Sequence, residues 1–218
     1  MKKSILSILL LFILASCGTT KIIDKPIVFN QERKELTLEY LKDRYNLIQD
    51  EPTITPKMVV VHWTAIPTFE KSFDAFYNVK LPTWRPDLKN ASPLNVSIQF
   101  LVDQDGIIYR LMDETTMARH VIGLNYCSIG IENVGGTKDT PLTKKQLKAN
   151  IKLINYLKEK YPKIEYVIGH FEYTKFEQTD LWLENDINYR TKKTDPGVNF
   201  ITKIRHATKK HQWKPIPN

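Results

Sequence analysis

The sequence predicts a single α/β domain in which helices flank a central mixed β-sheet. Two short apolar runs, Met58–Val61 and Tyr166–Gly169, have the composition of strands that are buried on both faces. Thr143–Lys160 has the apolar spacing of a long amphipathic helix. The chain has 218 residues, 42% of them hydrophobic, which suits one domain with one sizeable core.

Residues 1–16 are typical of a secretory signal peptide. Met1–Lys3 is basic, Ile5–Leu14 is almost wholly apolar, and two small residues follow. The apolar run is shorter than the roughly 20 residues that a membrane-spanning helix needs. We therefore expect this segment to be removed from the mature chain.

Leu14–Cys17 is similar to the lipobox of bacterial lipoproteins, in which cleavage leaves a lipidated cysteine at the N-terminus. An ordinary signal peptide with an incidental cysteine is the alternative. We expect lipidation of Cys17, with the membrane as a partner through this anchor. Residues 17–30 are then the lipidated cysteine and a tether, and residues 31–218 form the folded domain.

Helices are expected on both sides of the first apolar run and at the end of the chain. Glu32–Arg44 has apolar residues at helical spacing, and so does the segment that contains Phe69, Phe73 and either Phe76 or Tyr77. The last helix is expected over Val198–Lys209.

A hairpin and a further strand complete the predicted sheet. Val96–Val102 places alternate apolar residues on one face, Asp105-Gly106 signals a turn, and Ile107–Leu111 pairs back. Ser128–Glu132 has isoleucines on one face, and Ser128, Gly130 and Glu132 on the other. The serine and glycine leave room for another group to approach Glu132.

The helix over Thr143–Lys160 has clear end signals. Thr143 and Gln146 match a capping box, and Pro162 follows the last turn. The buried stripe is predicted at Leu147, Ile151, Ile154 and Leu157.

Charge and cysteine content restrict the partners. The formal net charge of +8 suits an anionic polymer or a membrane as a neighbour. The sequence has no zinc-finger cysteine spacing and no aromatic strand signature of an RNA-binding sheet, so we expect no nucleic-acid partner. Apart from the lipidated Cys17, Cys127 is the one cysteine expected in the mature chain, which excludes an intramolecular disulfide, and we expect it to be a small buried hydrophobe.

Each of the two apolar runs is followed by a histidine, His62 or His170. Ligands of α/β sheets commonly bind beyond the carboxyl ends of the strands, so the pair is a candidate metal site. Asp195 is held in an Asp-Pro-Gly turn, and two imidazoles with one carboxylate would provide zinc with three ligands. A single histidine in a strand is more often a satisfied core or surface residue, so the spacing alone leaves both interpretations open.

Five short motifs occur in an order that resembles the amidase-2 domain, the superfamily of zinc N-acetylmuramoyl-L-alanine amidases, phage amidases and animal peptidoglycan-recognition proteins. The resemblance extends from about Met58 to Phe200. The motifs are Val59–Thr64, Ala118–His120, Ser128–Asn133, Ile168–His170 and Lys193–Gly197.

The resemblance implies a role for each matching residue and an amidase-2-like or PGRP-like fold. His62, His170 and Asp195 match the zinc ligands. Glu132 matches the acidic residue that acts on the zinc-bound water, and Lys193 matches the lysine that stabilises the transition state. The residues expected to contact the substrate are His120, Trp63, Arg119 and Asn133.

The chain departs from the family pattern in two places. Phage members carry a catalytic tyrosine where this chain has Ser97-Ile98-Gln99, which leaves Glu132 as the base. The segment from His170 to Lys193 is also longer than in compact members. Either Lys192 or Lys193 then matches the motif lysine, and the Lys-x-Asp spacing favours Lys193. Aromatic residues of this segment either line a glycan groove or pack the segment onto the domain; they are Phe171, Tyr173, Phe176 and Trp182.

Together these observations predict a lipid-anchored, zinc-dependent amidase that cleaves the bond between N-acetylmuramic acid and L-alanine in peptidoglycan or muropeptides. The lipobox implies a cell-envelope location, at the periplasmic face of the outer membrane. A non-catalytic peptidoglycan-binding module on the same fold is the main alternative. A structural lipoprotein that tethers membrane to wall is the third.

Overall fold

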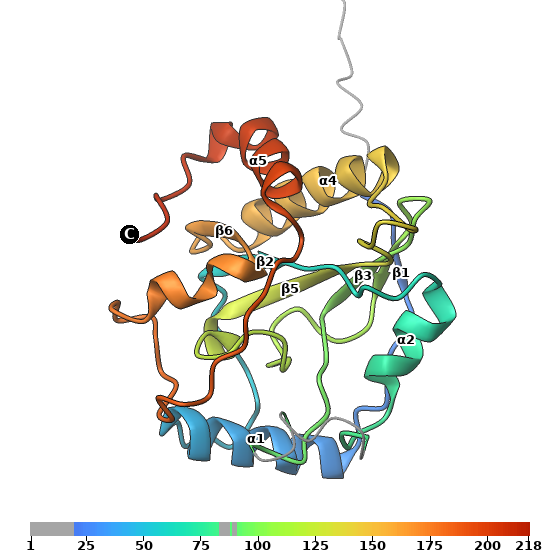
Figure 1. Ribbon diagram of the computed structural model, residues 1–218. Helices are drawn as coiled ribbons and strands as arrows, with labels where there is room; N and C mark the ends of the chain where they lie inside the picture. Colours follow the sequence, from blue (N-terminus) through green and yellow to red (C-terminus); the bar gives the residue numbers. More distant parts are fainter. Residues whose placement is uncertain (1–19, 83–87, 89–90) are drawn as a thin grey trace, which may run out of the picture.

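A mixed six-stranded sheet forms the centre of the molecule, with strand order β1-β4-β3-β5-β2-β6 (Figure 1). The computed structural model describes residues 20–82, 88 and 91–218, and Cys17 lies outside them. β3 and β4 are antiparallel, and the other neighbours are parallel, which confirms the predicted fold class. The strands are β1 Ile22–Asp24, β2 Met58–Val61, β3 Phe100–Val102, β4 Ile108–Arg110, β5 Ser128–Asn133 and β6 Tyr166–Gly169.

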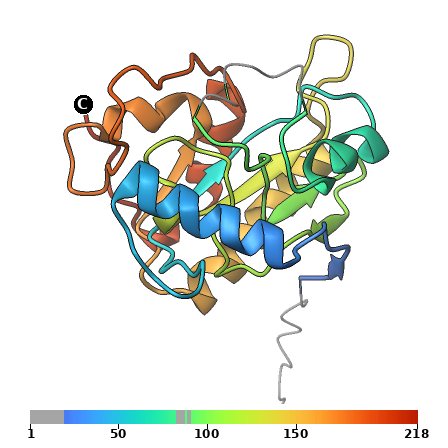
Figure 2. The same cartoon turned by 90° about the horizontal axis from the view of Figure 1, so that it is seen from below.

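Helices cover the sheet from both sides. Figure 1 shows α4 (Lys144–Lys160) and α5 (Val198–Ala207) above the sheet and α1 (Gln31–Tyr45) below it. The view from below shows α1 crossing in front of the strands (Figure 2). The short helix α2 (Phe69–Tyr77) flanks the sheet at the side. None of the helices in the described part of the chain is both long and apolar enough to span a membrane.

The run Met58–Val61 is a central strand that is covered on both faces, as its composition predicts. All four side chains are fully buried. Val59 and Val61 pack in the core beneath α4 and α5, whereas Met58 and Val60 pack in a second cluster on the opposite face.

The capping box of α4 is present, with Thr143 as N-cap and Gln146 closing it. The predicted buried stripe is partly wrong, because Leu147 and Ile151 are only half-buried. Gln146 and Asn150 take part of that face. Their amides donate to the main chain at Val134 (2.8 Å) and to the side chain of Asn133 (2.7 Å), which satisfies polar groups at the carboxyl end of the sheet.

Two boundaries differ from the prediction. The tether was expected to extend to residue 30, but Ile22–Asp24 pairs with β4, and Ile27 is buried. The hairpin strand begins only at Phe100, and Ile98 packs in a different cluster from Phe100. Next to Phe100, the main-chain N–H of Gly130 donates to the side-chain oxygen of Gln99 (2.8 Å) and not to a main-chain carbonyl of the hairpin strand.

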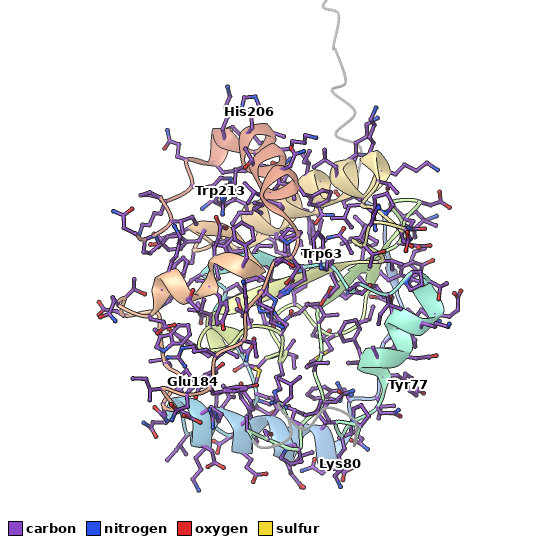
Figure 3. All side chains as sticks on the ribbon, in the orientation of Figure 1. Trp63, Tyr77, Lys80, Glu184, His206 and Trp213 are labelled. Atoms are coloured by element: carbon purple, nitrogen blue, oxygen red, sulfur yellow. The ribbon has the colours of Figure 1, made fainter. Side chains whose placement is uncertain are left out.

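The long segment after His170 packs onto the domain, so the second of its two predicted roles holds. Tyr173 and Phe176 are buried beneath β2 and β6. Trp182 stacks on Tyr173, with ring centroids 6.0 Å apart. Glu184 accepts from Arg44 of α1 at 2.5 Å, and Figure 3 shows it beside that helix. Cys127 is buried as expected, and burial raises the pKa of its thiol to about 12.

Candidate metal centre and adjoining cleft

The register of three parallel strands brings Glu132, His62 and His170 into one row. His62 extends β2, because its N–H donates to Ile131 O (2.8 Å) and its carbonyl accepts from Asn133 N–H (3.2 Å). Glu132 therefore lies opposite His62. On the other side Val61 pairs with Gly169, so the next residues, His62 and His170, are also neighbours. Residues in register on parallel strands project to the same face of the sheet.

Asp195 reaches this row from the loop that precedes α5. The main-chain N–H of Phe171 donates to the carbonyl of Asp195 at 3.1 Å, which ties the loop to the end of β6. The loop turns at Gly197, whose φ of +82° is a conformation that glycine adopts without strain. The carboxylate of Asp195 is thereby brought beside both imidazoles.

Three ligand atoms form a small triangle. The Nδ1 atoms of His62 and His170 are 2.9 Å apart, and Oδ2 of Asp195 lies 3.2 Å from the first and 3.0 Å from the second. Hydrogen bonds cannot satisfy all three sides. If both Nδ1 atoms carried hydrogens toward Asp195, two N–H groups would crowd each other. One cation at the centre satisfies all three atoms, so this buried group fits a metal ion.

The protonation states suit metal binding. Burial, together with the nearby His62, lowers the pKa of His170 to about 3, and burial lowers the pKa of His62. Burial alone would raise the pKa of Asp195, but its hydrogen bonds with the two histidines hold that pKa below its ordinary value. At neutral pH the site therefore offers two neutral imidazoles and one carboxylate, which are the forms that bind metals.

A cleft of about 270 Å³ opens onto the triangle. Lys193 is half-buried and lines the cleft, whereas Lys192 is exposed and is not among the lining residues. The cleft is also lined by Ala65, Ile66 and Phe76, which no sequence pattern indicated as part of a site. Helical spacing was the one signal at Phe76, and it did not indicate a cleft. The predicted residues that line the cleft are His62, Trp63, Arg119, His120, Glu132, His170, Lys193 and Asp195.

Two of the residues that are expected to contact the substrate also make hydrogen bonds within the fold. Arg119 is 3% exposed, and its guanidinium donates to the carbonyls of Leu88 and Ser92 and to the hydroxyl of Tyr189, at 2.8 to 3.1 Å. The side chain of Asn133 is fully buried and donates to the carbonyl of His62 at 2.9 Å. The motif did not show that these polar groups are used within the fold. Arg119 also lines the cleft, and contact of either residue with the substrate stays a prediction.

His120 lies against His62, with its Nδ1 3.0 Å from Nε2 of His62. Burial and the nearby His62 and His170 hold the pKa of His120 well below its ordinary value. The ring is therefore neutral at physiological pH, and one of its nitrogens can accept a hydrogen bond.

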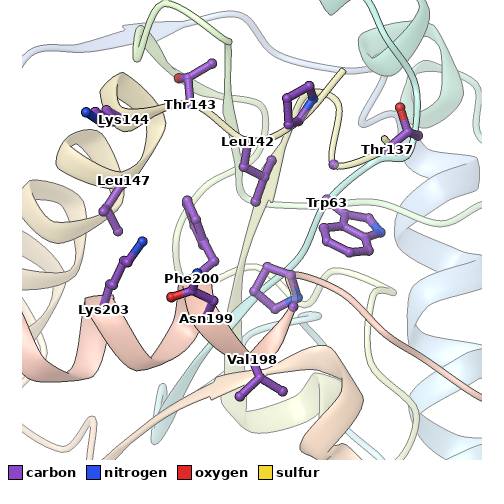
Figure 4. Close-up of a pocket in the computed structure, with 14 residues that line it drawn as sticks. Trp63, Thr137, Leu142, Thr143, Lys144, Leu147, Val198, Asn199, Phe200 and Lys203 are labelled. Carbon is purple, nitrogen blue, oxygen red and sulfur yellow. The ribbon is translucent and has the colours of Figure 1, made fainter. Parts of the chain in front are cut away.

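Trp63 lines both the cleft and a second hollow of about 390 Å³, and Figure 4 shows the second hollow. Its indole packs against Gly136, where a Cβ atom would approach Cγ of Trp63 to 2.3 Å. The hollow has an apolar wall that includes Leu142 and Phe200, and Lys203 stands at its edge. Trp63 thus contributes to the walls of both hollows, and its contact with the substrate stays a prediction.

One family model matches most of the chain, and solved structures share its fold. The model of a family described as N-acetylmuramoyl-L-alanine amidase matches residues 52–198. No curated protein sequence matches the chain. Among solved structures, the amidase LysC from Clostridium intestinale URNW is similar at a TM-score of 0.52 and 20% identity, over 90% of this chain and 100% of LysC.

Two further structures show the same fold. A selenomethionine derivative of AmpD has a TM-score of 0.52 and 21% identity, and the match covers 87% of this chain and 95% of AmpD. Bumblebee PGRP-SA has a TM-score of 0.52 and 21% identity, with 91% of this chain and 100% of PGRP-SA covered. At this level of identity the similarity establishes the architecture.

Proposed function

Because the chain belongs to the N-acetylmuramoyl-L-alanine amidase family, we propose that it hydrolyses the amide bond between N-acetylmuramic acid and the L-alanine of the stem peptide. The observation that carries the proposal is the buried triangle of His62, His170 and Asp195 at the base of an open cleft. A protein that only bound peptidoglycan would not need such a ligand set.

Zinc is the metal that the ligand set fits. Ligand atoms about 2.0–2.1 Å from a tetrahedral zinc ion lie about 3.3 Å from one another. The three separations here are 2.9, 3.0 and 3.2 Å. Two imidazoles and one carboxylate also form a common catalytic zinc set, which leaves a coordination position for water. When bound, zinc lowers the pKa of that water to near 7 and so supplies a nucleophile at neutral pH.

The remaining steps fall to side chains of the cleft. Glu132 would accept the proton of the attacking water and transfer it to the leaving amine of L-alanine. Lys193 would place its positive charge where negative charge develops on the former carbonyl oxygen. Burial is the main cause of the low pKa values of His62 and His170, and the charge of Lys193 lowers both a little further.

Replacement of Lys193 by alanine should lower kcat, while metal content and substrate KM change little. The reason is that its charge is needed more in the transition state than in the ground state. Steady-state kinetics on a soluble muropeptide, with metal analysis in parallel, measures both effects. Lys192→Ala is the matched control, because Lys192 is exposed and does not line the cleft. Damage confined to Lys192→Ala would show that the motif lysine is assigned one residue too late.

We also propose that the protein acts from a lipid anchor in the cell envelope, at the periplasmic face of the outer membrane. The lipobox-like sequence that ends at Cys17 supports this location. Cys17→Ser should abolish palmitate labelling, because the thiol that would carry the lipid is removed. The protein should then move from the membrane to the soluble fraction, since stable anchoring needs more than one acyl chain. Unchanged membrane partitioning of this variant would contradict the anchor.

Product analysis tests the function itself. The purified protein is incubated with intact sacculi and, separately, with soluble muropeptides, and the products are identified by mass spectrometry. Free stem peptide that begins with L-alanine is the expected product. If the protein binds either substrate but releases no peptide, it is a binding module and not an amidase.

A further inference from the structure

The two ring nitrogens of His62 face different surroundings. Nδ1 faces His170 and Asp195, and Nε2 faces Nδ1 of His120 at 3.0 Å. The rings of His62 and His120 meet edge to face, with centroids 5.1 Å apart and an interplanar angle of 85°. A neutral imidazole carries one hydrogen, so the contact at Nε2 decides whether Nδ1 keeps a free lone pair.

The hydrogen-bond partners of Nε2 of His120 determine which of its two ring nitrogens carries the hydrogen. The hydroxyl of Ser128 donates to the carbonyl of Leu124 at 2.7 Å, so its hydrogen is used there. Oγ of Ser128 can then only accept, and it lies 3.3 Å from Nε2 of His120. The carbonyl oxygen of Ser128, also an acceptor, lies 3.5 Å from the same nitrogen. Nε2 of His120 therefore carries the ring hydrogen.

This assignment determines the form of His62. Nδ1 of His120 has no hydrogen, so it accepts from Nε2–H of His62, and Nδ1 of His62 is left with its lone pair toward the triangle. We propose that His120 is a positioning residue that holds the tautomer and ring orientation of the metal ligand His62, through a hydrogen-bond chain that is anchored at the carbonyl of Leu124. The inference rests on the metal centre proposed above and adds a role to the substrate contact expected for His120.

The backbone around His120 is shaped for this contact. A Cβ atom at Gly130 would lie 2.9 Å from Nδ1 of His120 and 2.1 Å from Cδ1 of Ile98, so the ring lies directly on the glycine. The main-chain N–H of His120 donates to Oδ1 of Asn125 at 2.8 Å. The space that the sequence predicted beside Glu132 is therefore occupied by His120 and Ile98.

The test compares His120→Asn with His120→Leu in the full chain. Asparagine can place its amide oxygen near the position of Nδ1, whereas leucine fills the space without an acceptor. His120→Leu should weaken zinc affinity about 10- to 100-fold, the range typical for the loss of such a partner. His120→Asn should restore most of the affinity. Competition with a chromophoric chelator measures it, and the visible spectrum of the cobalt-loaded protein should shift in the leucine variant and return in the asparagine variant.

Ser128→Ala provides a second variant that leaves the ring in place. It removes one acceptor of His120, so its loss of affinity should be smaller than that of His120→Leu. Val96→Ala is the control, because Val96 lines the same cleft but takes no part in the hydrogen bonds from Leu124 to His62. The zinc affinity of this variant should stay unchanged. Circular dichroism checks that each variant is folded.

Two outcomes would overturn the inference. One is that His120→Leu and Ser128→Ala bind zinc as tightly as the wild type with an unchanged cobalt spectrum. The other is that His120→Asn loses as much affinity as His120→Leu, since acceptance at Nδ1 would then not be the cause. Neither measurement uses a substrate. A wild type that binds zinc but releases no stem peptide would contradict the proposed function alone.

Discussion

His62→Ala should reduce bound zinc from about one ion per chain to nearly none, and amide cleavage should be lost with it. Two ligands remain in this variant, and a catalytic zinc site needs three from the protein. Among the described residues, the group that could hold the metal consists of His62, His170 and Asp195, so the variant lacks one of its three ligand atoms. Elemental analysis of the purified protein measures the metal, and peptide release measures the activity.

His206→Ala is the matched control for this experiment. His206 is an exposed histidine on α5, and Figure 3 shows it at the outer end of that helix, away from Trp63. The control should keep both metal and activity. In the wild type, chelation should abolish cleavage, and added zinc should restore it. Full activity of His62→Ala with unchanged metal content would refute the ligand assignment.

Glu132→Gln should lower turnover by about 10²–10⁴, the usual contribution of a general base. The amide keeps the shape of the side chain but cannot take up the proton of the attacking water. Metal content and peptidoglycan binding should stay at the wild-type level, because Glu132 belongs to the cleft and not to the ligand triangle. The measurement is stem-peptide release under single-turnover conditions, with zinc determined in parallel.

Glu165→Gln controls for the loss of one carboxylate near the sheet. Glu165 is exposed, pairs with Lys214 at 2.7 Å and does not line the cleft, so its variant should cleave normally. If the Glu132→Gln variant cleaves the substrate as fast as the wild type, another group is the base. This outcome would not affect the assignment of the metal ligands.

Local signals in the sequence were sufficient for the elements that carry the site. The apolar runs before His62 and His170 predicted two buried strands, and Thr143 with Gln146 predicted the start of α4. These signals are short-range, because side-chain periodicity and helix caps depend on neighbouring residues. The Asp-Pro-Gly sequence likewise marked the turn that holds Asp195.

Hydrogen bonds between residues far apart in the sequence gave several residues structural roles that local sequence patterns did not indicate. Asn133 and Arg119 occur in motifs that suggest substrate contact, but both are used inside the fold, by His62 and by main-chain carbonyls. Edge pairing with β4 likewise made Ile22–Asp24 part of the sheet instead of a tether. The partner in each of these contacts lies far away in the sequence, so no short-range sequence pattern predicts the contact.

The sequence alone thus predicted the three candidate ligand residues and the two strands that precede the histidines. Only the tertiary structure decided that Glu132, His62 and His170 share one row, because this depends on the register among β5, β2 and β6. It also decided that His120 faces His62, since the space above Gly130 becomes visible only when the strands are assembled. A parallel register is a property of paired strands, and a shift by one residue would turn these side chains to the opposite face.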